Sequence, residues 1–276
     1  MMSKVWFVTG SSRGLGRNFV EAALSRGDMV AATARNIERL AELVTEYGDA
    51  VLPLELDVTD RAGVFDAVKR ADERFGRLDV IVNNAGYGLL GAVEELTEQQ
   101  LRDQLETNLF GAVWVTRAAL PYLRAQGGGH VIQISSVGGL AAWPLGGAYH
   151  ASKWALEGLS ESLAQEVAGF GIKVTLVEPA SYATDGAAGA VHAQADPLYT
   201  GLREAFAAYA QTLDLGDPSA AGRALLEVVD SANPPLRVFF GSGGNQIVPQ
   251  VYADRLETWA EWKDLAMAAQ GHTTAG

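Results

Sequence analysis

Short apolar runs alternate along the chain with longer amphipathic stretches. The runs span four to six residues and are rich in β-branched side chains, which is typical of buried strands rather than helices. They predict strands at residues 5–9, 29–34, 51–56, 80–83, 130–135, 173–178 and 237–240. Apolar residues at helical spacing predict helices at residues 37–47, 61–75, 101–123, 149–168 and 218–230.

This alternation predicts the fold class. Strands separated by helices favour right-handed crossovers and a parallel sheet covered on both faces. The sequence shows no internal repeat and no linker, so we expect one α/β domain over residues 1–276, a doubly wound sheet of about seven strands. Ligands bind at the carboxyl ends of strands in such sheets. Gly10, Asn83, Ser136 and Pro179 all follow such ends.

A glycine-rich loop joins the first strand to a helical pattern. It reads Thr9-Gly-Ser-Ser-Arg-Gly-Leu-Gly16, with Phe19 and Val20 on the apolar side of the helix that follows. Strand, glycine loop and helix is the context of a dinucleotide-binding site, because glycines let the backbone approach a pyrophosphate and the helix start offers free N–H groups. Three glycines in seven residues make an ordinary turn the weaker interpretation.

Tyr149 and Lys153 form a candidate acid/base pair. They are four residues apart in a predicted helix and share a face. A neighbouring cation favours the phenolate, so we expect Lys153 to lower the pKa of Tyr149. Such a tyrosine can donate a proton to a carbonyl oxygen or take one from an alcohol. The spacing is common on exposed helices, and it gains weight here from the glycine loop.

The two motifs together resemble the short-chain dehydrogenase/reductase family, over about residues 4–241. The loop matches that family's TGxxxGxG pattern, and residues 83–86 match its NNAG segment. Ser136 lies thirteen residues before Tyr149, the usual family spacing, so we assign it rather than Ser135. The resemblance implies the catalytic residues Asn108, Ser136, Tyr149 and Lys153. It also implies a Rossmann-type fold with a nicotinamide cofactor contacted by Gly10, Ser12, Arg13, Gly14, Leu15, Gly16, Arg35, Asp57, Val58, Asn84, Ala85, Gly86, Tyr149, Lys153, Pro179 and Thr184.

The end of the second strand predicts the cofactor. NAD-dependent members of the family carry an acidic residue there, whereas this chain has Ala34 followed by Arg35. Arg13 lies within the glycine loop, and two guanidinium groups suit a 2′-phosphate. We therefore expect NADP(H).

The chain departs from the family pattern at Ala180, which stands where the family commonly has glycine and could narrow the nicotinamide site.

The resemblance also predicts the reaction and substrate. We expect hydride transfer between NADP(H) and a carbonyl/alcohol pair, with Tyr149 as acid, Ser136 binding the oxygen and Asn108 holding a water linked to Lys153. The candidate substrate pocket comprises Tyr87, Val137, Trp143, Leu145, His150 and Tyr182, although we favour a structural role for His150. Its apolar character, and similarity to the branch with retinol and hydroxysteroid dehydrogenases, favour a lipophilic ketone or aldehyde.

Two segments extend this core. Residues 183–215 are small and then helical, and we expect them to form a substrate lid. Residues 241–276 form a C-terminal extension with Leu256, Trp259, Trp262 and Leu265 on one apolar face. We expect this extension to pack on its own domain, with a subunit contact as the alternative. By family resemblance we expect a homodimer or homotetramer built on the helices at 101–123 and 149–168.

Composition narrows the function classes. The net charge of -12 disfavours nucleic acid and anionic membranes as partners. No apolar run is long enough to span a bilayer, and the absence of cysteine suits a reducing compartment, so we expect a cytoplasmic protein. The four histidines have no ligand spacing, so we expect no metal.

Two alternatives remain open at this point. An epimerase or dehydratase on the same fold would give a redox-neutral product, but it usually carries a larger substrate domain. A non-enzymatic NADP(H) sensor often loses the tyrosine or lysine, whereas both are present here.

Overall fold

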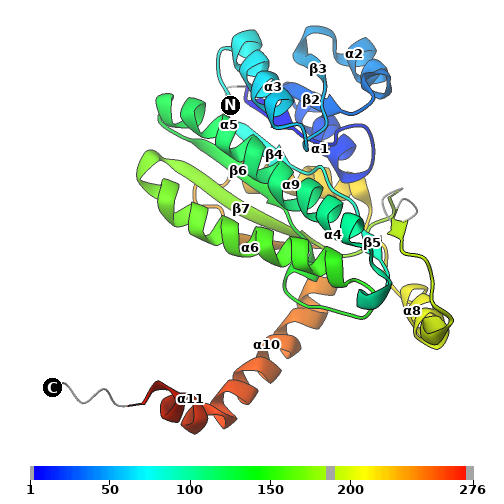
Figure 1. The fold of residues 1–276 in the computed structure, drawn as a ribbon. Coiled ribbons are helices and arrows are strands. Elements are labelled where there is room, and N and C mark those ends of the chain that lie inside the picture. Colours follow the sequence, from blue (N-terminus) through cyan, green and yellow to red (C-terminus); the bar gives the residue numbers. More distant parts are fainter. Residues whose placement is uncertain (1–2, 185–189, 272–276) are drawn as a thin grey trace.

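The computed structural model describes residues 3–184 and 190–271. Its centre is a parallel sheet of seven strands (Figure 1). The strands are β1 (Val5–Val8), β2 (Met29–Ala34), β3 (Val51–Glu55), β4 (Val80–Asn83), β6 (Gly129–Ile134), β7 (Ile172–Pro179) and β9 (Arg237–Phe240), and the separate pair is β5 (Leu89–Leu90) and β8 (Val191–His192). The order β3-β2-β1-β4-β6-β7-β9 is that of a doubly wound sheet, which confirms the predicted fold class.

Helices cover both faces of this sheet. The α-helices are α1 (Gly14–Ser25), α2 (Ala41–Tyr47), α3 (Arg61–Phe75), α4 (Glu98–Leu105), α5 (Gly111–Ala125), α6 (Gly147–Val167), α8 (Thr200–Ala210), α9 (Pro218–Asp230), α10 (Gly243–Glu261) and α11 (Lys263–Gln270). Shorter turns are η1 (Ile37–Leu40), η2 (Gly48–Ala50), η3 (Val93–Glu95), η4 (Glu106–Phe110), η5 (Val137–Gly139), η6 (Ala168–Phe170) and η7 (Pro197–Tyr199).

The core divides into two layers, one on each side of the sheet. In β1, Trp6 and Val8 pack with α1, α2 and α9, whereas Val5 and Phe7 pack with α3, α5 and α6. This alternation follows from strand geometry, because successive side chains point to opposite faces. Burial on both faces explains why the strands are apolar throughout. The sheet is thereby fixed as a rigid platform for the loops at its carboxyl edge.

Helix α3 has a capping residue at each end, so its boundaries could be predicted from the sequence. The Asp60 side chain accepts a 3.0 Å hydrogen bond from the Ala62 N–H and caps the start of the helix. Gly76 ends it in the left-handed conformation, at φ +76°. Between these caps, Val64 and Val68 are fully buried, in keeping with helical spacing. The predicted bounds, 61–75, are those observed.

The helix predicted at residues 101–123 is interrupted. Helix α4 begins earlier, where Thr97 and Gln100 form a capping box, and it passes into the π-helical turn η4 before α5. A π-helical turn inserts one residue into the helical repeat and is frequent at functional sites. The apolar spacing hid this insertion. Its consequence is that Asn108 is turned into the interior, where it is buried.

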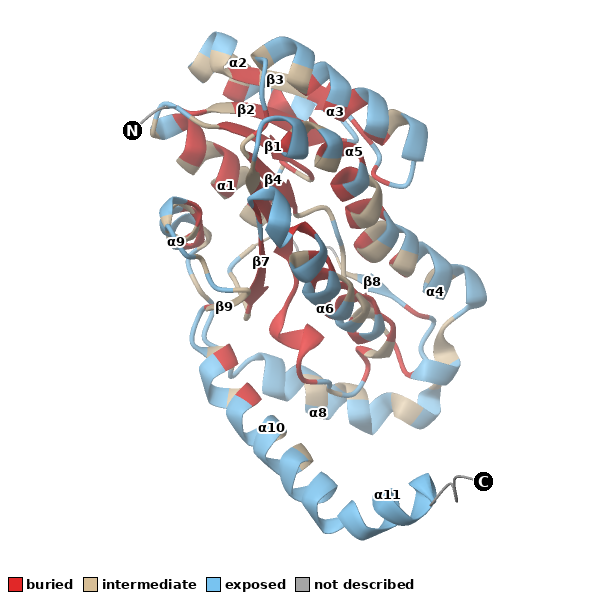
Figure 2. Cartoon of the chain, turned by 90° about the vertical axis from the view of Figure 1, so that its left-hand side faces the viewer, coloured by how far each residue is buried: buried red, intermediate tan, exposed pale blue. Residues whose placement is uncertain are grey.

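The C-terminal extension departs from its prediction. Figure 2 shows α10 and α11 leaving the body, with exposed residues along nearly all of their length. Leu256, Trp259, Trp262 and Leu265 are all exposed, so the expectation that this apolar face packs on its own domain is wrong. The first turns of α10 pack on the body through the buried Val248, and further along the helix Arg255 lies over the ring of Trp154 on α6.

None of the helices in residues 3–184 and 190–271 combines the length and hydrophobicity that crossing a bilayer requires. Of the predicted lid, residues 185–189 lie outside the described part. The remainder contains β8, η7 and α8, which agrees with the helical character expected there.

Candidate active site

The glycine loop connects β1 to α1 at the carboxyl edge of the sheet. Gly10 and Gly14 adopt positive φ angles of 68° and 57°, a region that glycine enters without steric cost. A methyl group at Gly16 would overlap the Gly10 carbonyl oxygen and the Asn84 side chain. Each glycine therefore meets a separate steric requirement. Together they leave backbone exposed beside the start of α1, which is a cradle suited to a phosphate.

Residues after β4 hold this loop in place. The Asn84 side-chain amide donates to the carbonyl oxygens of Thr9 and Gly10, at 2.9 and 3.1 Å. The Thr9 hydroxyl accepts hydrogen bonds from the N–H groups of Asn84 and Ala85, both at 3.0 Å. The NNAG segment therefore fixes the cradle directly, and the two motifs form one structural unit.

Replacing Gly16 with alanine is expected to weaken cofactor binding at least tenfold. The added methyl must displace Asn84 or the Gly10 carbonyl, and either shift reshapes the cradle. Titration of protein fluorescence with NADPH measures the effect. Gly158→Ala on α6 is the control, since a methyl there meets no atom within 4 Å and, like Gly16, this helical glycine has no positive φ. Equal affinities for wild type and Gly16→Ala would contradict the role given to this glycine.

Asn108 links the active-site helix to the segment after β4. Its side-chain amide donates to the Tyr87 carbonyl oxygen and to the Ser152 hydroxyl, both at 3.0 Å. Its carbonyl oxygen accepts from the Tyr87 N–H at 3.1 Å. Ser152 in turn donates to the backbone carbonyl of Tyr149 at 2.7 Å. Asn108 thus joins the loop after β4 to the helical turn that carries Tyr149.

Ser136 follows the end of β6, and Tyr149 lies in the first turn of α6. Ser136 caps η5, with its hydroxyl accepting from the Gly138 N–H at 3.0 Å. Burial raises the pKa of the Tyr149 phenol, and a hydrogen bond with Ser136 acts in the opposite direction. The side chains of Ser136 and Tyr149 therefore lie within hydrogen-bonding reach of each other.

Lys153 lies beside Tyr149 on α6, but the pKa of the phenol is not lowered as expected. Its ammonium donates to the Ile134 carbonyl oxygen at 2.8 Å and lies 5.9 Å from the centre of the Tyr149 ring. Burial lowers the pKa of Lys153 to about 8, against the opposing attraction of Glu157. The expected lowering of the Tyr149 pKa is replaced by a rise, because desolvation outweighs the other influences on the phenol.

A buried acidic cluster behind Lys153 was missed in the sequence. Glu157 lies one turn further along α6, and Arg237 of β9 donates to it at 2.9 Å. Glu178 of β7 is almost fully buried, 3.7 Å from Arg237. Burial, and then repulsion from Glu157, raise the pKa of Glu178 to about 8. The four-residue spacing of Lys153 and Glu157 was the available indication, but strand residue Glu178 gave none.

The raised pKa of Glu178 predicts how stability varies with pH. The folded state holds a proton there that the unfolded state releases, so stability is lost as pH rises from about 4.5 towards about 8. We expect Glu178→Gln to unfold several degrees higher than wild type at pH 8, with little difference at pH 5. Thermal denaturation at both pH values measures this, with exposed Glu166→Gln of α6 as control. An equal shift at both pH values would contradict a protonated Glu178.

The predicted adenosine end is open and basic. Arg13 and Arg35 are both exposed, and neither forms an ion pair within the described residues. The Asp57 carboxylate accepts from the Thr59 N–H and hydroxyl, at 2.9 and 2.8 Å, which fixes the turn after β3. Val58 is buried beneath that turn. Ser12 and Leu15 are half-buried on the loop itself.

The segment between Ser136 and Tyr149 is braced from within. His150 places Nδ1 2.9 Å from the Gly138 carbonyl oxygen and accepts at Nε2 from the Trp143 N–H at 3.2 Å. The imidazole is buried, and its pKa is lowered by that burial. Leu145 has a φ of 66°, the one positive value for a non-glycine residue in the described chain. The Leu145 carbonyl accepts from the Gly91 N–H at 2.8 Å, which holds this strained turn.

The predicted pocket residues therefore fall into two groups. Tyr87, Trp143 and Leu145 lie beside Asn108 or on the loop before Tyr149. Val137 instead packs with Leu140 and Val248 in a small core cluster, and Tyr182 lies against Gly216. His150 serves the loop rather than the pocket surface. Sequence proximity to the catalytic residues did not distinguish these orientations.

Ala180 finds room that the sequence did not reveal. Its methyl group lies towards Gly241 and Gly243, where any side chain would approach it at 3.4 and 3.1 Å. Its N–H donates to the Phe240 carbonyl at 2.9 Å. Thr184 lies against Gly14 of the cradle, where a methyl on the glycine would stand 3.6 Å from the threonine Cβ. The substitution at Ala180 is thus matched by glycines after β9.

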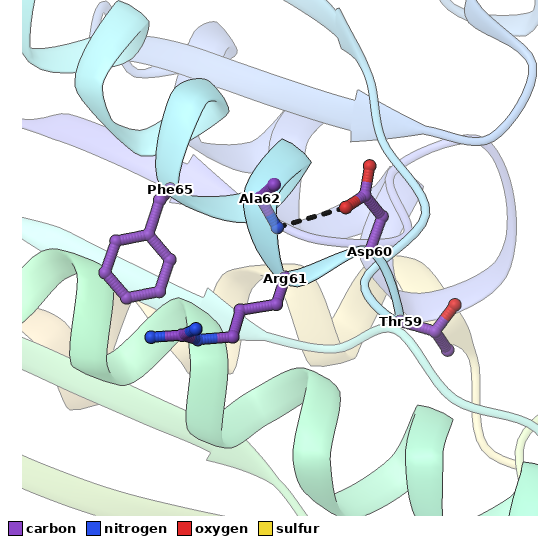
Figure 3. Close-up of a pocket in the computed structure, with 5 residues that line it drawn as sticks. All are labelled: Thr59, Asp60, Arg61, Ala62 and Phe65. Carbon is purple, nitrogen blue, oxygen red and sulfur yellow. Dashed lines mark hydrogen bonds between the residues drawn. The ribbon is translucent and has the colours of Figure 1, made fainter.

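A separate hollow of about 430 Å³ lies at the start of α3, and Figure 3 shows the residues around it. Asp60 there is engaged in capping the helix, and Arg61 lies over the rings of Phe65 and Trp114. It contains none of the predicted catalytic residues. No group of three or more metal-ligating side chains gathers anywhere in residues 3–184 or 190–271.

The family follows from comparison with known proteins. The family model for short chain dehydrogenases matches residues 4–195, so this chain belongs to that family. "Oxidoreductase BOA17" of Botryotinia fuckeliana (strain B05.10) is 41% identical over 97% of this chain and 100% of its own length. "3-ketodihydrosphingosine reductase" of Bacteroides thetaiotaomicron is 36% identical over 87% of this chain and 89% of its own. The chain is thus a short-chain oxidoreductase.

Solved structures agree with this assignment. A short-chain dehydrogenase from Streptomyces avermitilis superposes with a TM-score of 0.92 at 39% identity, covering 97% of this chain and 98% of the other. An alcohol dehydrogenase from the archaeon Thermococcus sibiricus, complexed with 5-hydroxy-NADP, gives a TM-score of 0.73 at 26% identity. That match covers 87% of this chain and 96% of the other. The chain therefore has the Rossmann-type architecture of its family along almost all of its length.

Proposed function

We propose that this oxidoreductase uses NADPH to reduce a lipophilic ketone or aldehyde. The observation that carries the proposal is the meeting of Ser136 and Tyr149 at the carboxyl edge of the sheet, with Lys153 on the next turn of α6. Chain connectivity brings the glycine cradle to the same edge. A proton donor, an oxygen-binding hydroxyl and a phosphate cradle are the parts that carbonyl reduction requires.

Each catalytic residue has a separate role in this reaction. Bound nicotinamide supplies the hydride. Tyr149 protonates the developing alkoxide, and its raised pKa keeps the phenol protonated and ready to donate. Ser136 donates a hydrogen bond to the same oxygen and stabilises its negative charge. Lys153 binds the nicotinamide ribose, and Asn108 fixes the turn that positions Tyr149.

The preference for NADP(H) rests on Arg13 and Arg35. Both guanidinium groups are exposed at the predicted adenosine end, and Ala34 leaves no carboxylate to repel a 2′-phosphate. The related archaeal alcohol dehydrogenase complexed with 5-hydroxy-NADP supports this choice. The other cofactor contacts, Gly10 to Gly16, Asp57, Val58, Asn84 to Gly86, Pro179 and Thr184, are proposed on the family pattern.

The substrate class rests on the apolar loop before α6. Trp143 and Leu145 lie on it, and a relative named for reduction of a 3-ketodihydrosphingosine supports a long-chain carbonyl substrate. Residues 190–215 would cover this site as a lid. The absence of cysteine suits a reducing cytoplasm, where NADPH-dependent reduction would take place.

Turnover of a carbonyl panel tests the proposal. NADPH oxidation is followed by absorbance with aliphatic, aromatic and steroid-like ketones and aldehydes. We expect long-chain and bulky apolar carbonyls to be reduced with the highest kcat/KM and to give stoichiometric alcohol. A redox-neutral product without net NADPH consumption would refute the reduction. Faster turnover of short charged ketones would refute the substrate class alone.

A further inference from the structure

Helix α10 carries one apolar stripe, only half of which is covered. Val248 is buried against Val137 and Leu140 of the body. One turn later, Tyr252 lies beside Arg255, whose guanidinium is 5.2 Å from the Tyr252 ring and 4.7 Å from the ring of Trp154 on α6. Beyond Arg255, every described residue of α10 and α11 is exposed. The stripe reaches the edge of the body here without ending.

Beyond this point the same stripe continues into solvent. Leu256 and Trp259 follow Tyr252 at spacings of four and seven residues, so all three lie on one helix face. They are 61% and 67% exposed, whereas Val248 is 8% exposed. Trp262, Leu265 and Met267 extend the apolar surface into α11, each about 60% exposed. We call residues 256–271 the arm, which Figure 1 shows projecting from below α6.

The arm exposes a large apolar surface to water, which is energetically unfavourable. Single exposed apolar residues are ordinary, but a contiguous apolar patch of several hundred Å² marks an interaction site. By the size of aromatic and aliphatic side chains, the arm exposes on the order of 600 Å² of such surface. If each of two arms covered an equal area of a partner, the total would exceed the ~1,600 Å² of a standard interface.

The charge of the arm disfavours a lipid surface as its binding partner. Around the stripe, four carboxylates stand against two cations: Asp254, Glu257, Glu261 and Asp264 against Arg255 and Lys263. Helices that bind anionic membranes carry an excess of lysine and arginine on their polar face. The arm has the opposite balance, in keeping with a protein partner.

The position of the arm favours a second copy of this chain. It leaves the body at Trp154 of α6, and the turns that adjoin α5 and α6 also expose aromatic rings, Phe110 of η4 and Phe170 of η6. In a twofold dimer every contact between the two copies occurs twice. An arm that projects beside these helices can therefore cover a surface of the second copy, while the arm of the second copy covers the equivalent surface of the first. We propose that the arm packs on the α5–α6 face of a second copy, whose own arm packs back on the first.

Sedimentation velocity of the full chain tests whether the arms of two copies pack on each other's bodies. We expect a wild-type dimer or tetramer at micromolar concentration, and at least a tenfold rise in its dissociation constant for Leu256→Glu/Trp259→Glu. The matched control Gln246→Glu/Gln250→Glu adds two carboxylates at exposed positions on the opposite side of the same helix and is expected to leave association within twofold of wild type. Circular dichroism of each variant reports whether the body remains folded.

A single-cysteine experiment provides a second readout that does not depend on weakening the interface. The chain has no cysteine, so Leu256→Cys can be labelled uniquely with benzophenone maleimide. Illumination is expected to give a covalent dimer, whereas the same label at exposed Glu46→Cys of α2 is expected to give none. A monomeric wild type, an unchanged dissociation constant for the double variant, or no covalent dimer from position 256 would each overturn the proposal. Sedimentation of a monomeric chain with phosphatidylserine vesicles would assign the stripe to a membrane and overturn it as well.

Discussion

Replacing Tyr149 with phenylalanine is expected to reduce kcat for carbonyl reduction by about 10³-fold, within the range by which positioned general acids accelerate reactions. The change removes only the phenolic oxygen. Tyr149 is the proposed proton donor, and the hydroxyl of Ser136 can bind the substrate oxygen but has no comparable acidity. The affinity for NADPH is expected to change by less than about twofold, because ring packing on α6 is preserved. Steady-state kinetics and NADPH titration measure the two effects.

The control for this substitution is Tyr122→Phe on α5. It makes the same chemical change at a half-buried tyrosine that packs in the core layer away from the site. Its kcat is expected to equal that of wild type. Retention of full activity by Tyr149→Phe would remove Tyr149 from the role of acid, and equal losses in both variants would point to a structural effect.

Replacing Arg13 or Arg35 with alanine is expected to weaken NADPH binding at least tenfold each, with NADH binding unchanged within about twofold. A hydrogen bond between a guanidinium and a phosphate contributes about 1.5–3 kcal/mol, which corresponds to tenfold or more in affinity. NADH lacks the 2′-phosphate and so loses nothing. Isothermal titration with both cofactors measures the difference.

Arg17→Ala is the matched control for the two arginines. Arg17 lies on the first turn of α1 but is already paired with Glu21, at 2.6 Å, and with Glu42, at 3.4 Å. Its loss is therefore expected to leave both cofactor affinities within twofold of wild type. Equal affinity of the wild-type protein for NADH and NADPH would refute the assignment of a 2′-phosphate site.

The sequence predicted most of the sheet because its strands are buried on both faces. Such strands must be apolar throughout, so β2 and β4 stand out at their observed bounds. The glycine loop and the NNAG segment were equally readable, since Gly16 and Asn84 answer a steric requirement that few other residues meet. Local rules of this kind act through neighbouring residues and leave a visible pattern.

Features that depend on distant contacts left no such pattern. The space for Ala180 comes from Gly241 and Gly243, some sixty residues later. The burial that raises the pKa of Tyr149 and Glu178 arises only when α6, β7 and β9 pack together. The apolar side of α10 read as a core-facing helix, because periodicity shows which face is apolar but not what covers it. The three cases share one cause, which is that tertiary packing decides the outcome.

The most direct test of the account is the fate of the hydride. NADPH deuterated at the nicotinamide C4 is incubated with a long-chain ketone that the enzyme turns over, and the product is examined by mass spectrometry. The account predicts an alcohol carrying the deuterium on the former carbonyl carbon, with formation slowed about 10³-fold in Tyr149→Phe. A product without deuterium, or one formed as fast by Tyr149→Phe, would contradict hydride transfer assisted by this tyrosine.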